Sequence, residues 1–205
     1  MPGRSVHTAL LGAVLLVLFW SGVRPHDYFT WFLEVLPALL GLTILIATYR
    51  RFRFTTLVYG LIAVHAVILM VGGHYTYAEM PLFNWIRDHF GLARNDYDRL
   101  GHFAQGFVPA LVAREFLLRT TPLKRGKLLV YLILSICLAV SAFYELCEWR
   151  AAAAFGSAAD AFLGSQGDVW DTQWDMAWAL IGAATALLTL SRAQDRALDR
   201  LRVSA

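Results

Sequence analysis

Six long apolar runs take up most of this chain, and they constrain its fold more than any other feature. Each is about long enough for a helix that crosses the hydrocarbon core of a bilayer, which takes roughly 20 residues. Hydrophobic residues make up 58% of the chain, against about 45–50% in soluble domains. We therefore predict an all-α polytopic membrane protein, a helical bundle that forms one integral domain over residues 1–205. The expected transmembrane helices are 8–23, 31–49, 55–72, 98–118, 127–149 and 170–191.

Basic residues indicate how the chain crosses the membrane, because cytoplasmic loops carry an excess of Lys and Arg. Such residues follow the second, fourth and sixth apolar runs: Arg50, Arg51, Arg53, Lys124, Arg125, Lys127, Arg192, Arg196, Arg200 and Arg202. We therefore expect both termini in the cytoplasm and loops 73–97 and 150–169 outside. The first run lacks a cleavage site before Arg24 and Pro25, so we interpret it as an uncleaved helix. Because the basic residues are scattered among loops, nucleic acid is not an expected partner.

Acidic and histidine residues gather near the ends of the expected helices that face outside. An ionisable group at mid-span costs roughly 2.5–3.5 kcal/mol, so a group of them at the boundary indicates a site. The residues concerned are His74, Asp96, Asp98, His102, Glu145, Glu148, Asp168, Asp171 and Asp175.

Helical spacing places these residues on shared faces. Asp98 and His102 are four apart, so the carboxylate can orient the imidazole or both can bind one ion. Glu145 and Glu148 are three apart on the fifth expected helix. The sixth has acids at i, i+3 and i+7, on one side over about two turns. If these three helices are neighbours, the groups converge near the outer boundary. The candidate catalytic residues are His102, Asp98, Glu145, Asp171 and Asp175.

So many carboxylates cannot all stay ionised in a small space without a cation, a shared proton or a buried arginine. Arg99 and Arg150 are the local basic candidates. Oxygen ligands with one or two imidazoles suit Zn²⁺, Mn²⁺, Mg²⁺ or Ca²⁺. The candidate metal ligands are His102, Glu145, Glu148, Asp171, Asp175 and His74. A network of protonated or arginine-paired carboxylates and simple solvation at the surface are the alternatives.

Several of these residues also have structural interpretations. Asp98 and Asp168 could cap the N-termini of their helices, where free backbone amides and the helix dipole favour an acid. Glu148 could pair with Arg150 at the membrane boundary. His65 lies inside the third expected helix without an acidic neighbour in sequence, which favours a structural role.

The two outer loops are expected to contain short helices. Within loop 73–97, apolar residues of the segment 81–90 recur at helical spacing, which predicts an amphipathic helix along the membrane surface. Loop 150–169 could form a similar short helix. Both segments would then lie over the site as lids.

Four motifs resemble the YjdF-type family of bacterial inner-membrane proteins, which has no firmly assigned activity. They are HYTY at 74–77, NDYDRLGHF at 95–103, ELCEW at 145–149 and GDVWDTQWDM at 167–176. The resemblance implies a multi-pass protein of the bacterial inner membrane. A more distant similarity to VanZ-like membrane proteins rests on DRLGH at 98–102 and on the segment 171–175. There Asp175 takes the place of an asparagine, which adds a charge.

Three functions fit the sequence, and whether the protein is an enzyme stays open. The first is a membrane enzyme acting on a lipid or lipid-linked substrate, with His102 and Asp98 as acid and base and the other acids binding metal or activating water. The second is a cation- or proton-binding protein related to transport. The inner halves of the helices, however, show no matching series of polar residues apart from Arg114 and Glu115, which can snorkel. The third is a structural component of the envelope; the sequence predicts no oligomeric state.

Overall fold

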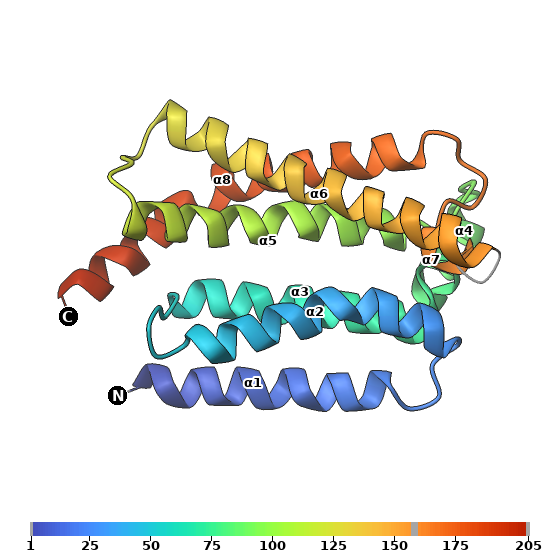
Figure 1. Ribbon diagram of the computed structural model, residues 1–205, viewed down its shortest axis with the longest axis horizontal. Helices are drawn as coiled ribbons and strands as arrows, with labels where there is room; N and C mark the ends of the chain where they lie inside the picture. Colours follow the sequence, from blue (N-terminus) through green and yellow to red (C-terminus); the bar gives the residue numbers. More distant parts are fainter. Residues whose placement is uncertain (1, 157–159, 204–205) are drawn as a thin grey trace.

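The described residues of the chain, 2–156 and 160–203 of a computed structural model, form helices joined by loops and contain no strand (Figure 1). The all-α prediction is therefore confirmed. The elements are α1 (Pro2–Ser21), α2 (Tyr28–Thr48), α3 (Thr56–Tyr75), η1 (Tyr77–Glu79), α4 (Pro81–Phe90), α5 (Tyr97–Thr120), α6 (Lys127–Phe155), α7 (Asp160–Leu163) and α8 (Asp171–Val203).

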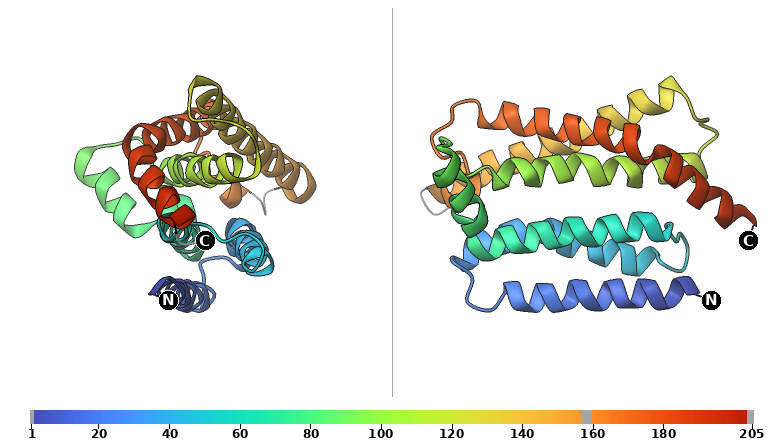
Figure 2. Two further views of the ribbon diagram at one scale, coloured as in Figure 1. Left: turned by 90° about the vertical axis from the view of Figure 1, so that its left-hand side faces the viewer. Right: turned by 180° about the vertical axis from the view of Figure 1, so that it is seen from behind.

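The long helices α1, α2, α3, α5, α6 and α8 run side by side along one axis (Figures 1 and 2). The short helices α4 and α7 lie at one end of this bundle, and both termini lie at the other. We call these the α4 end and the terminal end. The basic loops between α2 and α3 and between α5 and α6 lie at the terminal end. The chain thus passes along the bundle six times and returns to the end where it began.

Four helices, α2, α3, α6 and α8, are long and apolar enough to cross a membrane, and α1 adds a shorter apolar segment, Ser5–Ser21. The predicted fourth span corresponds to α5, which carries charged residues near both of its ends. It lies in the middle of the bundle, packed on α3, α6 and α8. Helices α6 and α8 extend well beyond the spans expected at 127–149 and 170–191, because α6 continues to Phe155 and α8 to Val203.

Two charged residues near the terminal end of α5, Arg114 and Glu115, are buried and paired, so the expectation that they snorkel is wrong. Glu115 is 0% exposed and accepts hydrogen bonds from the amide and hydroxyl of Thr55 at 2.8 and 2.7 Å. Arg119 pairs with the same carboxylate at 2.8 Å. Since Thr55 is the N-cap of α3, Glu115 fixes the start of α3 against α5.

A second polar contact joins α5 to α8 at the same end. Arg114 donates hydrogen bonds to Gln194 at 3.0 Å and to Asp195 at 2.7 Å. Gln194 in turn donates to the backbone carbonyl of Leu111 at 2.7 Å. Burying these groups is tolerable because each has a partner, whereas an unpaired buried charge would cost several kcal/mol.

Two glycines let the backbones of α5 and α8 touch. A Cβ on Gly106 of α5 would lie 1.7 Å from the carbonyl oxygen of Ala179. One on Gly182 of α8 would lie 2.0 Å from the carbonyl oxygen of Phe103. Both distances are far inside van der Waals contact and both involve backbone atoms. This approach sets how close the polar faces of the two helices come.

We predict that Gly106→Val separates α5 from α8 and lowers the free energy of unfolding by about 3 kcal/mol, the upper part of the range for overpacking. Thermal unfolding of the purified protein in detergent measures the loss. Gly12→Val in α1 is the matched control, because a Cβ there meets nothing within 4 Å. Equal melting temperatures for the two variants would contradict the close packing of α5 on α8.

Candidate functional site

Three buried side chains near the α4 end form a compact group. Asp98 and His102 come from α5, one turn apart, and Asp175 comes from α8. Each offers one ligand atom, and these atoms all lie within 4.8 Å of one another. His102 Nε2 lies 3.5 Å from Asp98 Oδ1 and 3.9 Å from Asp175 Oδ2. The close contact of α5 with α8 brings them together.

The two glutamates of α6 complete this group. Glu145 Oε1 lies 3.8 Å from His102 Nε2. Glu148, one turn nearer the end of the bundle, is also buried and interacts electrostatically with Glu145, Asp98 and Asp175. The structure therefore brings together the acids that the sequence assigned to three separate helices. We call Asp98, His102, Glu145, Glu148 and Asp175 the acidic cluster.

Arg94, in the loop between α4 and α5, closes the cluster toward the end of the bundle. It forms a short ion pair with Asp171 and lies 3.6 Å from Asp98 Oδ2. Burial by itself lowers the pKa of Arg94, but the hydrogen bond to Asp171 and the charges of Asp171, Asp98 and Asp175 raise it overall. Asp171 is thus engaged by an arginine rather than grouped with Asp98, His102 and Asp175.

The sequence identified two other arginines as partners of the acids. Arg99 pairs with Asp96 at 3.0 Å and with Asp168 at 3.4 Å, at the rim of the site. Arg150 instead lies over the ring of Trp149, with its guanidinium carbon 5.8 Å from the ring centre. Within the described part of the chain it forms no ion pair with Glu148, so that expected pair is wrong.

The capping interpretation fails for Asp98 and holds in part for Asp168. The N-cap position of α5 is Asp96, while Asp98 is buried within the first turn. Asp168 accepts a hydrogen bond from the amide of Trp170 at 2.9 Å, just before α8 begins, and it also pairs with Arg99. Asp168 therefore supports the start of α8 from the rim.

Besides Arg94, sequence reasoning missed three residues at this site: Glu34, Tyr77 and Tyr144. Glu34 of α2 is 3% exposed and interacts with Asp98, His102 and the hydroxyl of Tyr77. Tyr144 of α6 contacts the His102 ring edge-on, with centroids 6.2 Å apart. A lone glutamate inside an apolar run was a signal for Glu34, because such a residue is costly in a span.

The Tyr77 ring is held between two glycines. A Cβ on Gly72 of α3 would lie 1.8 Å from this ring, and one on Gly101 of α5 would lie 3.1 Å from it. Tyr77 itself is 5% exposed. The two glycines thus let an aromatic ring wedge between α3 and α5 beside Glu34 and Asp98.

The two outer segments are joined to each other above the cluster. The amide of Asn95 donates to Gln166 at 2.9 Å, and the Gln166 side chain donates back to the Asn95 carbonyl at 2.8 Å. Arg94 donates to the carbonyl of Gly164 at 3.2 Å, and a Cβ on Gly164 would lie 3.5 Å from Asp98 Oδ2. The segment before α8 therefore covers Asp98.

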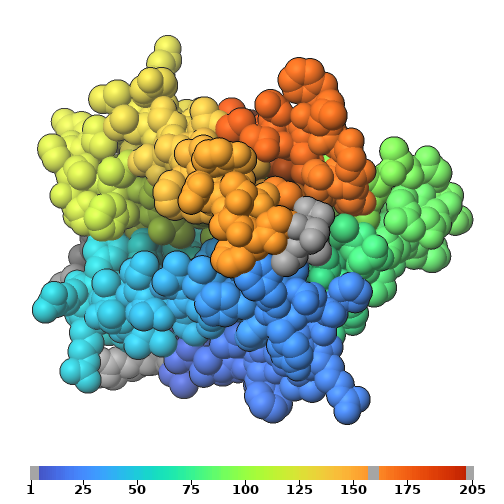
Figure 3. Space-filling view, turned by 45° about the vertical axis from the view of Figure 1, so that its right-hand side comes forward, coloured from blue at the N-terminus to red at the C-terminus, as the bar shows by residue number. Residues whose placement is uncertain are grey.

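The helix α4 is present, as the sequence predicted for 81–90, and it has no buried residue. In Figure 3 it projects, light green, from the body of the molecule. The second expected helix is only α7, Asp160–Leu163, whose Phe162 contacts the Tyr144 ring with centroids 6.2 Å apart. Residues 157–159 of that loop lie outside the described part.

Two histidines lie away from the acidic cluster. His74 Nδ1 lies 3.0 Å from the carbonyl oxygen of Ser21, and its ring is 4.4 Å from that of Trp20. It therefore ties α3 to α1, and it is not among the residues that could share a metal ion with His102. His65 lines a cavity between α1, α2 and α3, nearer the terminal end.

Several polar atoms of the cluster have no hydrogen-bond partner among the described residues. They include His102 Nδ1, Glu145 Oε1, Asp175 Oδ1 and the Tyr144 hydroxyl. More than about 90% of buried polar groups in proteins are paired, so a concentration of exceptions needs an explanation. Carboxylate and imidazole atoms at these distances could share a cation or exchange a proton.

Fold and site together define a polytopic helical membrane protein with a buried acidic cluster at one end of the bundle. The chain belongs to the family described as predicted membrane protein DUF2238, whose model matches residues 6–196. It is 51% identical over 185 residues to the inner membrane protein YjdF of Escherichia coli (strain K12), covering 90% of this chain and 88% of that protein. No solved structure matches it.

The family relationship confirms the resemblance drawn from the four motifs, and with it an inner-membrane protein that has several membrane-spanning helices. The similarity to VanZ-like proteins stays a prediction. So do the roles of the individual site residues, because the family carries no assigned activity.

We predict that Arg94→Gln leaves Asp171 and Asp98 without their cation and destabilises the fold by about 3 kcal/mol, as expected when one member of a buried ion pair is removed. For a chain of this size the melting temperature should fall by about 6–12 °C. Thermal unfolding in detergent measures it.

The matched control is Arg87→Gln on α4, where the arginine pairs with Asp88 at 2.8 Å on the surface. This variant should melt with the parent protein, because exposed ion pairs contribute little. If Arg94→Gln also melted with the parent, Arg94 would not be what balances Asp171.

Proposed function

We propose that the acidic cluster is a divalent-cation site of a membrane enzyme that acts on a lipid or lipid-linked substrate at the outer leaflet. One observation carries the proposal: Asp98, His102 and Asp175 offer ligand atoms within 4.8 Å of one another, beside the unpartnered Oε1 of Glu145. Catalytic zinc sites commonly use three protein ligands and leave a further position open.

Charge balance supports a cation at this position. Asp98, Asp175, Glu145 and Glu148 are all buried, while Arg94, the arginine beside them, is shared between Asp98 and Asp171. Acids this close cannot all be ionised unless positive charge or shared protons compensate them. Zn²⁺, Mn²⁺, Mg²⁺ and Ca²⁺ all accept carboxylate oxygens, and an imidazole favours Zn²⁺ among them.

The residues divide into those that would hold the metal and those that would move protons. Asp98, Asp175 and His102 are the ligands. Glu145, with an unpartnered oxygen 3.8 Å from His102, is placed to accept a proton from water. A bound divalent ion would supply Lewis-acid activation of that water. Arg94 positions the segment above Asp98 through Gly164.

The surroundings of the cluster support a lipid substrate. Large apolar side chains are exposed on the same end of α6 and at the start of α8: Phe143, Leu146, Trp149, Trp170 and Trp174. Trp and Tyr favour the boundary between hydrocarbon and headgroups. A substrate that arrives within the membrane would meet these side chains beside the cluster.

The outward direction follows from the positive-inside rule. The basic loops and both termini share one end of the bundle, which we assign to the cytoplasm. The acidic cluster at the α4 end then faces the outer leaflet. A C-terminal fusion to a reporter that fluoresces only in the cytoplasm tests the assignment, which fails if the fusion is dark.

For the metal, we expect the purified protein to carry close to one divalent ion per chain by elemental analysis. Asp175→Asn and His102→Gln should each weaken binding more than about 100-fold, because even a residue that only orients a ligand contributes about 10–100-fold. Asp88→Asn on the exposed face of α4 is the control and should keep the ion. Parent protein that binds none of the four ions would favour the network of protonated and arginine-paired carboxylates instead.

For the reaction, we expect the lipid extract of cells that produce the parent protein to differ from that of cells producing Asp175→Asn. The change should concern one lipid or lipid-linked sugar, because the variant lacks a ligand but keeps the shape of the site. Mass spectrometry at matched protein levels measures it. Identical extracts would contradict an enzyme and leave a cation-binding or structural protein.

A further inference from the structure

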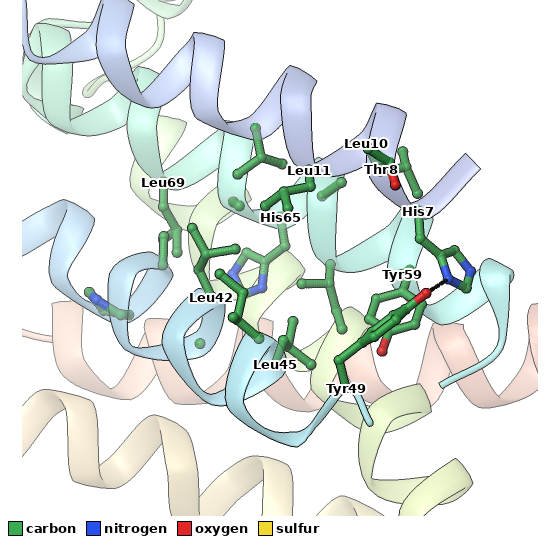
Figure 4. A pocket seen from close by; sticks show the side chains of 18 residues that line it. His7, Thr8, Leu10, Leu11, Leu42, Leu45, Tyr49, Tyr59, His65 and Leu69 are labelled. Carbon is green, nitrogen blue, oxygen red and sulfur yellow. Dashed lines mark hydrogen bonds between the residues drawn. The ribbon is translucent and has the colours of Figure 1, made fainter. Parts of the chain in front are cut away.

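A cavity lies between α1, α2 and α3, in the half of the bundle toward the terminal end (Figure 4). Its volume is about 450 Å³, within the range of small-molecule sites. Most of its wall is aliphatic, including Leu11, Val14, Pro37, Leu45, Ile62 and Leu69. It is separate from the acidic cluster, and its occupant is independent of the function proposed for that cluster.

The cavity exists because α1 and α2 pack mainly on α3, and small residues leave space between them. Ala38 and Gly41 of α2 and Ala63 and Ala66 of α3 all line it. A Cβ on Gly41 would meet nothing within 4 Å. Larger side chains at these positions would fill the space. The small residues in the sequence therefore create the cavity.

Three rings close the terminal end of the cavity. His7 Nδ1 lies 2.9 Å from the Tyr49 hydroxyl, drawn as a dashed line in Figure 4. The His7 and Tyr59 rings are 4.5 Å apart. Arg53 lies over Tyr49, its guanidinium carbon 4.7 Å from the ring centre. A cation therefore stands where the apolar cavity meets the basic loop between α2 and α3.

Water is a poor occupant for this cavity. A liquid water takes roughly 30 Å³, so about 15 would be needed, and each buried water needs two to four polar partners. Among described wall residues, the buried polar atoms without a partner are His65 Nε2 and the Tyr59 hydroxyl. Two such atoms hold one or two waters, and the rest of the wall calls for an apolar occupant.

We propose that this cavity binds one acyl chain of an anionic phospholipid, whose phosphate meets Arg53 at the ring-lined end. Charge complementarity identifies the headgroup, because Arg50, Arg51 and Arg53 stand together in the loop beside the cavity mouth. Basic residues next to a span attract anionic lipids. The apolar wall would contact the acyl chain, since burying each CH₂ group in an apolar environment is favourable.

The test uses the full chain, reconstituted in vesicles of equal phosphatidylglycerol and phosphatidylethanolamine and then released in mild detergent. Native mass spectrometry counts the lipids that stay bound. We expect one retained phosphatidylglycerol per chain. Gly41→Phe should lower the retained fraction about tenfold by filling the cavity, a change that corresponds to 1.4 kcal/mol of binding.

Two variants distinguish binding of the acyl chain from recognition of the headgroup. Gly12→Phe adds the same ring to α1 at a position that does not line the cavity and has open space around its Cβ, so it should retain lipid as the parent does. Arg53→Gln should keep a bound lipid but lose the preference for phosphatidylglycerol, since it removes only the cation.

Ala63→Leu fills the same cavity from α3 and serves if Gly41→Phe fails to give folded protein by circular dichroism. The proposal is overturned if the parent retains no lipid, or if both cavity-filling variants retain it as well as the parent. Equal retention of the two phospholipids by the parent would overturn the assignment of Arg53 to an anionic headgroup. These outcomes do not depend on whether the acidic cluster binds a cation, so this proposal and the proposed function can fail separately.

Discussion

The cost of placing charge in a low-dielectric interior governs this structure. α5 is charged near both ends and is too polar to face lipid along its length. It lies in the middle of the bundle, against α3, α6 and α8, so its charged side chains meet protein groups. The glycine contacts at Gly106 and Gly182 then draw α8 against it. Of the other long helices, α3 and α6 pack on this pair, and α1 and α2 pack on α3.

The buried charged groups at the two ends of α5 differ in how they are paired. At the terminal end, Glu115 bonds to Thr55 and Arg119, and Arg114 to Gln194 and Asp195, so each of these charges has a partner. Such pairings are explained by packing alone. At the α4 end, acids from three helices face one histidine, and several of their atoms lack partners among the described residues. Packing therefore explains the first end, whereas the unpartnered atoms at the second end are the reason for proposing a cation there.

The sequence predicted what depends on local periodicity. Apolar run length located the helices, and spacing placed Asp98 with His102 on one face. It missed Arg94 and Glu34, because their roles depend on which loop and which helix pack against α5, and no local pattern encodes that. It misjudged Glu115 and Arg114 for the same reason. The partner of Glu115 is Thr55, 60 residues away along the chain, and a partner of Arg114 is Asp195, 81 residues away.

Arg94 connects the acidic cluster to the segment that covers it. Its guanidinium lies 3.6 Å from Asp98 and also binds the carbonyl of Gly164. A cation shared by Asp98, His102 and Asp175 would compete with Arg94 for Asp98 and weaken the hold of Arg94 on that side. Because coupling between two binding events is reciprocal, opening the segment around Gly164 would in turn favour the cation. Substrate entry and metal affinity would therefore be linked through one arginine.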